Sequence, residues 1–337
     1  MISFESIINE IRIRRIDPLA RKLAEKYGYR PYMVQRYLEM MGFDECVELL
    51  EAFETLRPPP TIRCNNLRID CNELVTRLER LGFELEPVPW CNYCYNVVKA
   101  PRSPSIGATH EYLKGYYYVY RDAAPTIPPI ICAPKPRWIV LDVCAAPGGK
   151  ATHLLQQMED RGLLVANEIS RPRIALLLTH LHRMGFKSFI VLNEDGRVLP
   201  YKLRLEFDYI LVDAPCSAEG RIMYDPSRKT KTSEEDLAQL VLREIELLSA
   251  SIRLAKPGAF IVYATCSIAP EENEYVVSKV LELHRNVEII EPFIRIGDRG
   301  LTGFAHLTFD PRVSRCVRLW PHKHKVEGFF VCIFRKM

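Results

Sequence analysis

The sequence predicts an α/β fold built on an open, mostly parallel sheet, and three observations indicate it. Beyond about residue 129, strand-like segments alternate with helix-like segments, an alternation that produces parallel strands joined by right-handed crossovers. Glycine-rich or polar sequences follow several of the expected strands, at the positions where open sheets bind ligands. A proline-rich stretch separates this region from a smaller α/β region that precedes it.

The first 57 residues are predicted to form short, packed helices. Apolar residues recur at helical spacing between Ile7 and Leu56, with interruptions at Gly28 and Gly42. The three prolines after Arg57 cannot continue a helix, so we expect a boundary there. Residues 1–57 are therefore assigned to an N-terminal helical segment.

Residues 58–128 are predicted to form a small α/β domain. Strand-like sequences at 61–65 and 96–99 flank an amphipathic helix at 72–81, which Gly82 closes. A group of tyrosines follows at positions 112, 116, 117, 118 and 120. We expect them to pack in the core, the alternative being a surface on which bases stack.

Residues 129–337 are predicted to form a third unit, with a seven-stranded sheet. Prolines between 125 and 136 are interpreted as a linker that leads into it. The expected strands are residues 138–143, 163–167, 188–192, 209–212, 259–264, 287–290 and 329–334. Helices are expected to follow Gly149, Arg171, Ser233 and Pro270.

Composition favours a soluble intracellular protein. No apolar run approaches the roughly 20 residues that cross a bilayer, and the first residues lack the pattern of a secretory signal. We therefore expect a cytoplasmic monomer without a membrane partner. The net charge of +4 is too small to indicate nucleic-acid binding by itself, although basic residues cluster at 12–22, 221–231 and 312–325.

The eleven cysteines are predicted to be mostly buried thiols, because no secretory signal precedes them. Cys64, Cys71, Cys91 and Cys94 could form a zinc site, but a second Cys-x-x-Cys pair is missing. We therefore predict no metal, and the sequence leaves open whether these four cysteines form disulfides.

The loop after the first strand of the large sheet is predicted to bind a nucleotide-like cofactor. It reads Cys144, Ala145, Ala146, Pro147, Gly148, Gly149 and Lys150. Glycines at a strand-to-helix turn let the backbone approach a ligand, and the following helix offers free N–H groups. The loop lacks both the Gly-x-Gly-x-x-Gly and the P-loop spacing, which favours S-adenosylmethionine (SAM) over NAD or ATP.

Two carboxylates at the next strand ends are consistent with this cofactor. Glu168 ends the second strand, where nucleotide sites place a carboxylate that binds the ribose hydroxyls. Asp195 ends the third strand and could accept a hydrogen bond from the adenine amino group. Without further context, an ordinary Asp-Gly turn explains Asp195 equally well.

Two cysteines follow the fourth and fifth strands, and their position predicts thiolate chemistry. Cys216 comes shortly after Asp213, and Cys266 follows Thr265. Adjacent parallel strands end in one crevice, so both thiols should lie near the cofactor. Carbon 5 of cytosine becomes nucleophilic once a thiolate adds to carbon 6. Asp213, helped by Lys150, is the expected acid at ring nitrogen 3.

These motifs resemble the NSUN (Nop/Sun-domain) family of RNA cytosine-5 methyltransferases from about Thr61 onward. The family's motifs occur in order at residues 142–150, 167–168 with Arg173, 193–195, 213–217, 264–267 and 327–330. The resemblance implies a Rossmann-like class I SAM-dependent methyltransferase fold with a small RNA-recognition-like domain. The substrate of such an enzyme would be single-stranded or loop RNA, because the target base must leave its stack to reach the active site.

The resemblance also implies roles for individual residues. Residues 144–150, Glu168, Arg173, Asp195 and Asp213 correspond to the SAM site, Cys266 to the nucleophile, and Cys216 to the cysteine that assists product release. Residues 105–116 resemble archaeal members that modify tRNA, so tRNA is the expected substrate and rRNA the alternative. An RNA-binding protein with a degenerate methyltransferase domain is another reading, but it would be expected to lose Gly148 or one of the cysteines, and the sequence keeps them.

Overall fold

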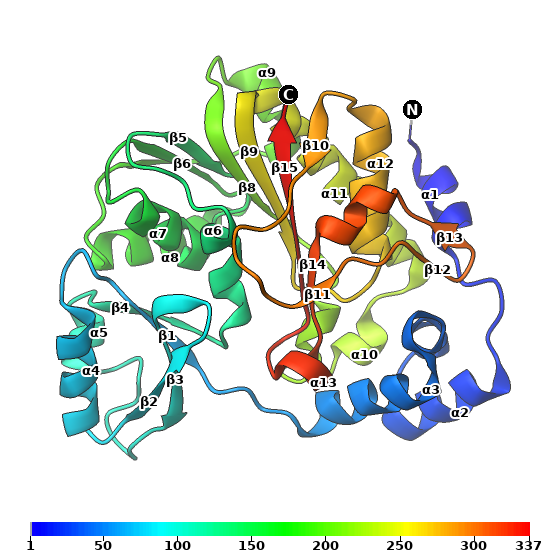
Figure 1. Cartoon of the computed structure of the whole chain (residues 1–337), viewed down its shortest axis with the longest axis horizontal. Coiled ribbons are helices and arrows are strands. Elements are labelled where there is room, and N and C mark those ends of the chain that lie inside the picture. The colour runs from blue at the N-terminus through cyan, green and yellow to red at the C-terminus, as the bar shows by residue number, and fades with distance from the viewer. Residues whose placement is uncertain (1) are drawn as a thin grey trace.

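A twisted sheet of nine strands forms the centre of the computed structural model, which describes residues 2–337 (Figure 1). Five neighbouring strands are parallel, in the order β7 (Phe189–Leu192), β6 (Leu163–Asn167), β5 (Ile139–Asp142), β8 (Phe207–Asp213) and β9 (Ala255–Thr265). Antiparallel strands complete it, namely β15 (Phe329–Lys336), β10 (Val287–Ile289), β14 (Val317–Leu319) and β11 (Asp298–Arg299). The predicted α/β fold is confirmed.

All seven strands predicted for the large sheet are present, but the sheet has nine. The two strands of this sheet that were not predicted, β14 and β11, contain three and two residues. Segments this short carry no readable periodicity, and both depend on pairing with β15 or with each other. These two short strands therefore add an edge to the large sheet that the hydrophobic pattern of the sequence does not predict.

Alternate residues of the central strands face two different helical layers. On β8, Tyr209 and Leu211 belong to one buried cluster, whereas Ile210 and Val212 belong to the other, as the two-residue period of a strand requires. The first layer contains α6 (Ile127–Ile131), α7 (Gly149–Gln157) and α8 (Arg171–Arg183). The second contains α9 (Leu199–Lys202), α11 (Glu234–Leu254) and α12 (Val276–Leu283). Buried on both faces, the sheet holds its strand ends in fixed positions.

The predicted proline-rich linker is a structured part of the core. Residues 124–126 form a 3₁₀ turn (η1), and α6 follows it directly. Pro128 and Pro129 are buried in the first turn of α6, where a missing backbone N–H costs no helical hydrogen bond. The linker prediction was therefore wrong for Pro125, Pro128 and Pro129, whereas Pro134 and Pro136 lie in the irregular stretch before β5.

The small domain is a four-stranded antiparallel sheet. Its order is β2 (Glu84–Val88), β3 (Cys91–Lys99), β1 (Thr61–Cys64) and β4 (Tyr117–Tyr120), with α4 (Cys71–Arg80) and α5 (His110–Leu113) beside it. Tyr117 is buried in the domain's own core, and Tyr118 and Tyr120 pack into the α7 layer of the large sheet. Core packing is thus confirmed for these three tyrosines, whereas Tyr112 and Tyr116 are only partly buried against the core of the small domain.

The N-terminal helices pack on the α11 side of the large sheet (Figure 1). They are α1 (Phe4–Ile11), α2 (Pro18–Tyr27) and α3 (Pro31–Thr55). Gly28 ends α2 in a left-handed conformation, and Gly42, at φ +78° and ψ −176°, has a non-helical backbone that divides α3 into two helices. The expected breaks at Gly28 and Gly42 are therefore confirmed.

The remaining elements are short and lie in loops. They are β12 (Gly303–Phe304), β13 (Leu307–Thr308), α10 (Arg228–Lys231), α13 (Pro321–His324) and the turns η2 (Gly196–Val198), η3 (Glu219–Arg221), η4 (Glu271–Tyr275) and η5 (Pro311–Arg315). Over residues 2–337, none of the helices has the length and apolar character needed to cross a bilayer.

The cysteines depart from the prediction. Disulfide bonds join Cys64 to Cys71, Cys91 to Cys94, and Cys316 to Cys332. The expectation of mostly free thiols was wrong, because it rested on the missing secretory signal and not on which cysteines the fold brings together. Free thiols remain at Cys46, Cys132, Cys144, Cys216 and Cys266. Two of these lie at the site described next.

Candidate active site

Two adjoining cavities lie at the carboxyl ends of the parallel strands. The larger, here called the thiol cavity, measures about 420 Å³ and is bordered by Asp213, Cys216 and Cys266. The smaller, here called the carboxylate cavity, measures about 340 Å³ and is bordered by Glu168 and Asp195. Residues 144–147, 149 and 150 line the thiol cavity, and Cys144, Arg173 and Pro215 line both. The fold thus brings the predicted site residues to one edge of the sheet.

The glycines of the predicted cofactor loop are required by their surroundings. Gly148 adopts φ +114°, a conformation that side chains with a Cβ rarely take. A Cβ on Gly149 would lie 2.9 Å from a ring carbon of Tyr120. Gly149 also begins α7, so the free N–H groups of this helix face the thiol cavity. The loop can therefore approach a ligand with its backbone.

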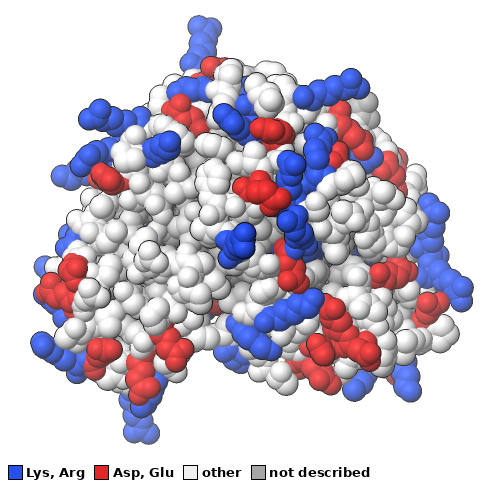
Figure 2. All heavy atoms as spheres, viewed as in Figure 1, with Lys and Arg blue, Asp and Glu red and all other residues white. Residues whose placement is uncertain are grey.

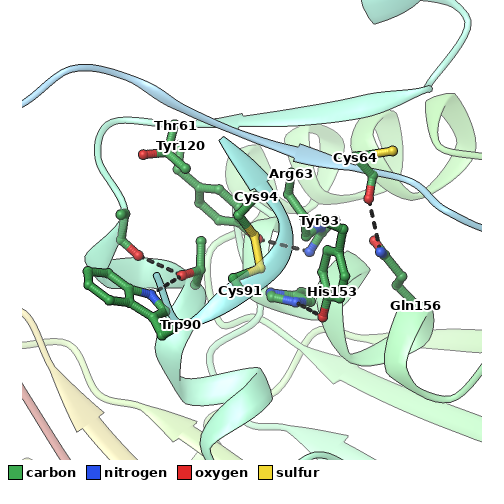
Figure 3. The surroundings of a disulfide bond; sticks show 12 residues. Thr61, Arg63, Cys64, Trp90, Cys91, Tyr93, Cys94, Tyr120, His153 and Gln156 are labelled. Carbon is green, nitrogen blue, oxygen red and sulfur yellow. Dashed lines mark hydrogen bonds between the residues drawn. A yellow bond between two sulfur atoms is a disulfide. The ribbon is translucent and has the colours of Figure 1, made fainter. Parts of the chain in front are cut away.

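An arginine from the small domain, shown beside Tyr120 in Figure 3, contacts the end of the loop. Arg63, on β1, is fully buried and donates to the carbonyl of Gly149 at 3.0 Å, the hydroxyl of Tyr120 at 2.9 Å and that of Thr152 at 2.8 Å. Figure 3 also shows the Cys91–Cys94 disulfide close to this group. The small domain therefore holds the first turn of α7, a contact that sequence reasoning missed.

The carboxylate cavity contains two acidic groups that are already positioned. Glu168 is buried, and its carboxylate accepts from the backbone N–H of Ser170 at 2.9 Å and lies 3.1 Å from Arg173. Asp195 accepts from the backbone and the guanidinium of Arg197, which holds the pKa of Asp195 below its usual value. Asp195 also starts a 3₁₀ turn. It is therefore both a turn residue and a group at the cavity wall.

Lys150 and Asp213 form an ion pair at the floor of the thiol cavity, 2.7 Å apart. Burial disfavours the charged ammonium, but Asp213 outweighs burial, and the pKa of Lys150 lies above its usual value. A paired carboxylate accepts hydrogen bonds, so the proton of this pair resides on Lys150. The pair therefore offers a proton on Lys150 at the thiol cavity, next to the carboxylate of Asp213.

The two thiols differ in acidity, because their pKa values shift in opposite directions. Cys216 Sγ and Cys266 Sγ are 3.4 Å apart. A hydrogen bond from the Cys216 thiol lowers the pKa of Cys266, helped by the nearby Arg221 and Lys150. That same hydrogen bond, together with burial, raises the pKa of Cys216. The pair therefore favours a Cys266 thiolate beside a Cys216 thiol, and the thiolate is the nucleophilic form.

Sequence reasoning missed that Arg221 and Glu327 line the thiol cavity beside the sulfur pair, with Asp122 behind Glu327. Arg221 Nε lies 3.3 Å from a carboxylate oxygen of the buried Glu327. The backbone N–H of Glu327 donates to Asp122 at 2.7 Å, and burial followed by repulsion from Asp122 raises the pKa of Glu327. Glu327 stands in the last motif of the resemblance, but no local pattern indicated that it would reach the thiols.

Replacing Arg221 should make the Cys266 thiol less acidic. Arg221→Gln removes a positive charge that stabilises the thiolate, so the pKa of Cys266 rises and its alkylation by iodoacetamide shifts to higher pH. The rate against pH is measured by mass spectrometry of the Cys266 peptide. Arg253→Gln, on the exposed side of α11, is the control and should leave the curve unchanged. Identical curves for Arg221→Gln and the unmodified chain would contradict this electrostatic role.

Comparison with protein families gives two matches that together span most of the chain. Residues 129–335 match the family described as 16S rRNA methyltransferase RsmB/F. Residues 31–120 match the N-terminal domain of 16S rRNA methyltransferase RsmF. The two matches include nearly all of both sheets and every residue of the thiol cavity except Arg121 and Pro125.

Curated relatives extend the similarity into the N-terminal helices. The chain is 36% identical over 334 residues to the 25S rRNA (cytosine-C(5))-methyltransferase nop2 of Schizosaccharomyces pombe, covering 97% of this chain and 54% of that protein. It is 36% identical to the human 28S rRNA (cytosine(4447)-C(5))-methyltransferase, covering 96% of this chain and 40% of that protein. The chain thus spans about half the length of the curated relatives it matches.

Solved structures show the same fold. A methyltransferase homolog protein from Pyrococcus horikoshii superimposes with a TM-score of 0.85 at 31% identity, covering 95% of this chain and 100% of that one. NSun6 from Pyrococcus horikoshii, determined with SFG, has a TM-score of 0.79 at 21% identity, covering 90% and 97%. At 21% identity, the second match shows only that the two chains share a fold.

Proposed function

Because this chain belongs to the RsmB/F family of RNA cytosine-C5 methyltransferases, we propose that it transfers a methyl group from SAM to carbon 5 of a cytosine in RNA. The observation that carries the proposal is the sulfur pair: Cys266 Sγ lies 3.4 Å from Cys216 Sγ, in the cavity that the glycine loop also lines. Methylation of a small molecule or of a protein side chain has no use for this pair.

The residues present fit SAM. The backbone of the loop at 144–150 can approach the cofactor closely, because Gly149 has no side chain and its surroundings leave no room for one. The buried Glu168 can accept hydrogen bonds from the two ribose hydroxyls. Arg173 and Asp195 complete the wall of the carboxylate cavity, where we place the adenosine. When bound, SAM supplies the methyl group as an electrophile.

In the proposed reaction, the Cys266 thiolate adds to carbon 6 of the cytosine. A sulfur–carbon bond forms, the double bond between carbons 5 and 6 opens, and Lys150 stabilises the charge that reaches ring nitrogen 3. Carbon 5, now nucleophilic, accepts the methyl group. Its proton must then leave, so that the C–H electrons restore the double bond and Cys266 departs as thiolate.

Cys216 is placed to accept that proton. While Cys266 is a thiolate, its charge raises the pKa of Cys216. Once Cys266 is bonded to carbon 6, its charge and its hydrogen bond with Cys216 are gone, so the pKa of Cys216 falls, and burial remains as the main cause that still raises it. Cys216 is therefore able to act as a base late in the cycle, which agrees with the role in product release that the family resemblance implies.

Ribosomal RNA is the favoured substrate. The relatives whose names state a target are rRNA methyltransferases, which favours rRNA over the expected tRNA. Surface charge does not discriminate, because acidic side chains lie among the basic ones on the face seen in Figure 2. The monomeric state, the cytoplasmic location and the domain boundaries after residues 57 and 128 stay predictions.

Deuterated SAM tests the reaction and its substrate together. The protein is incubated with SAM carrying a CD₃ group and either unmethylated rRNA or tRNA, and the digested nucleosides are identified by mass spectrometry. We expect 5-methylcytidine containing the CD₃ group, from rRNA. Label on the protein or on another base would contradict the reaction, whereas labelled 5-methylcytidine from tRNA alone would contradict the rRNA assignment. Bisulfite sequencing then locates the cytosine.

A further inference from the structure

A fully buried arginine from the N-terminal helices contacts both loops that carry the reactive cysteines. Arg36 lies on α3 and has no exposed surface. Its Nη1 lies 3.3 Å and 3.2 Å from the two carboxylate oxygens of Glu271. Its Nη2 pairs with Glu219, whose other oxygen accepts from the hydroxyl of Tyr37. One guanidinium therefore bridges two carboxylates.

Each carboxylate belongs to a different cysteine loop. Glu219 comes three residues after Cys216 and begins the short turn η3. Glu271 comes five residues after Cys266 and begins the π-helical turn η4. The guanidinium is planar and rigid, so two carboxylates bound to its two nitrogens are held at a fixed separation. The loops that follow the two sulfurs are thereby tied to one group.

Bonds between the two loops exist without Arg36, but they act at other points. The backbone N–H of Gly220 donates to the carbonyl of Cys266 at 3.0 Å, and Glu272 accepts from the backbone N–H of Ser217 at 2.6 Å. Tyr37 reaches only the Cys216 loop, through Glu219, whereas Arg36 contacts both loops from the N-terminal helices. It lines neither cavity, so its role is not to touch SAM or RNA.

We propose that Arg36 is a positioning residue that holds Cys216 and Cys266 at their reactive separation, which makes the N-terminal helices part of the active site. The catalytic consequence rests on the proposed function, whereas the geometric claim does not. Because a misplacement of about 1 Å can cost about 10²-fold in rate, a small shift between the loops is expected to be visible in turnover.

The test uses a variant that loses the bridge without leaving unpaired buried charge. Arg36→Met alone would strand two buried carboxylates and could unfold the chain. The triple variant Arg36→Met, Glu219→Gln, Glu271→Gln removes all three charges. Its matched control is Arg12→Met with Glu235→Gln, which breaks an exposed ion pair between the same N-terminal segment and α11. Circular dichroism and SAM affinity report whether each variant is folded.

The rate at which diamide oxidises the two thiols to a disulfide reports whether the sulfurs are held close together. Two thiols lose two hydrogens, which reduce diamide to the hydrazine, and a Cys216–Cys266 disulfide forms; peptide mapping follows its rate. In the triple variant we expect this rate to fall at least about tenfold and kcat about 10²-fold, with SAM affinity unchanged. The control should match the unmodified chain. Arg36→Lys keeps the positive charge but loses the planar guanidinium that binds two carboxylates at once. Its oxidation rate and kcat are expected to lie between those of the triple variant and the unmodified chain.

Several outcomes would decide the matter. Unchanged oxidation and turnover in the triple variant would overturn the inference, as would equal losses in the control. If the triple variant did not fold, Arg36→Lys would be used instead. An oxidation rate and kcat equal to those of the unmodified chain would then overturn the inference. Slower oxidation in a chain that methylates no RNA would support Arg36 as a positioning residue while refuting the proposed function, so the two can fail separately.

Discussion

Cys266→Ala is expected to lower methyl transfer to RNA by at least about 10³-fold while leaving SAM affinity within about twofold. Without the thiolate, nothing adds to carbon 6, and carbon 5 stays too electron-poor to accept a methyl group. SAM affinity should persist because the groups proposed to hold SAM lie in the glycine loop and the carboxylate cavity. Single-turnover methylation and calorimetric titration with SAM measure the two effects.

The matched control is Cys46→Ala. Cys46 is also a free cysteine but is buried on α3 and lines neither cavity. Its loss should leave turnover nearly unchanged where the variant remains folded. Methyl transfer by Cys266→Ala at more than a tenth of the normal rate would refute the assignment of the nucleophile.

Cys216→Ala is expected to accumulate a covalent protein–RNA adduct. Methylation proceeds, because Cys266 and the cofactor loop are intact, but the base that removes the carbon 5 proton is missing. The sulfur–carbon bond then persists, and turnover should fall about 10²-fold or more. A denaturing gel should show a band of lower mobility that carries RNA and disappears after nuclease treatment.

The double variant Cys216→Ala, Cys266→Ala separates this explanation from nonspecific crosslinking. It lacks the sulfur that forms the bond, so no adduct should remain. An adduct of equal yield in the double variant would contradict the division of roles. Normal multiple turnover by Cys216→Ala would show that another group removes the proton.

The chemistry of this site was readable from the sequence because each group stands at the end of a predicted strand. Glu168, Asp213, Cys216 and Cys266 all follow segments whose apolar runs predict buried strands, and parallel strands end at one edge of their sheet. Position along the chain was therefore sufficient to predict that these groups converge. The loop glycines were recognisable for the same reason.

Contacts that join distant parts of the chain were not predictable in this way. Arg36 and Arg63 look like solvent-exposed basic residues in sequence, yet both are fully buried. Each is stabilised by partners from another unit: Arg36 by two carboxylates of the catalytic loops, and Arg63 by the first turn of α7. No local periodicity records such a partner, so tertiary packing decides both.

Helix-breaking signals were similarly ambiguous. Prolines at 128 and 129 were interpreted as a linker, but at the start of a short helix their fixed φ is compatible with helical structure. The disulfides show the same limit, since Cys316 and Cys332 are brought together by the pairing of β14 with β15, whose pairing partners the sequence did not indicate. In each case, packing or pairing with a neighbouring element decides the local structure.

The most direct measurement of the central claim is the identity of the residue bonded to RNA. The adduct of Cys216→Ala is digested with trypsin and nuclease, and tandem mass spectrometry locates the residual nucleotide. We predict a single modified residue, Cys266, carrying a 5-methylated cytidine through sulfur. A nucleotide on any other residue, or a cytidine without the methyl group, would contradict the proposed mechanism.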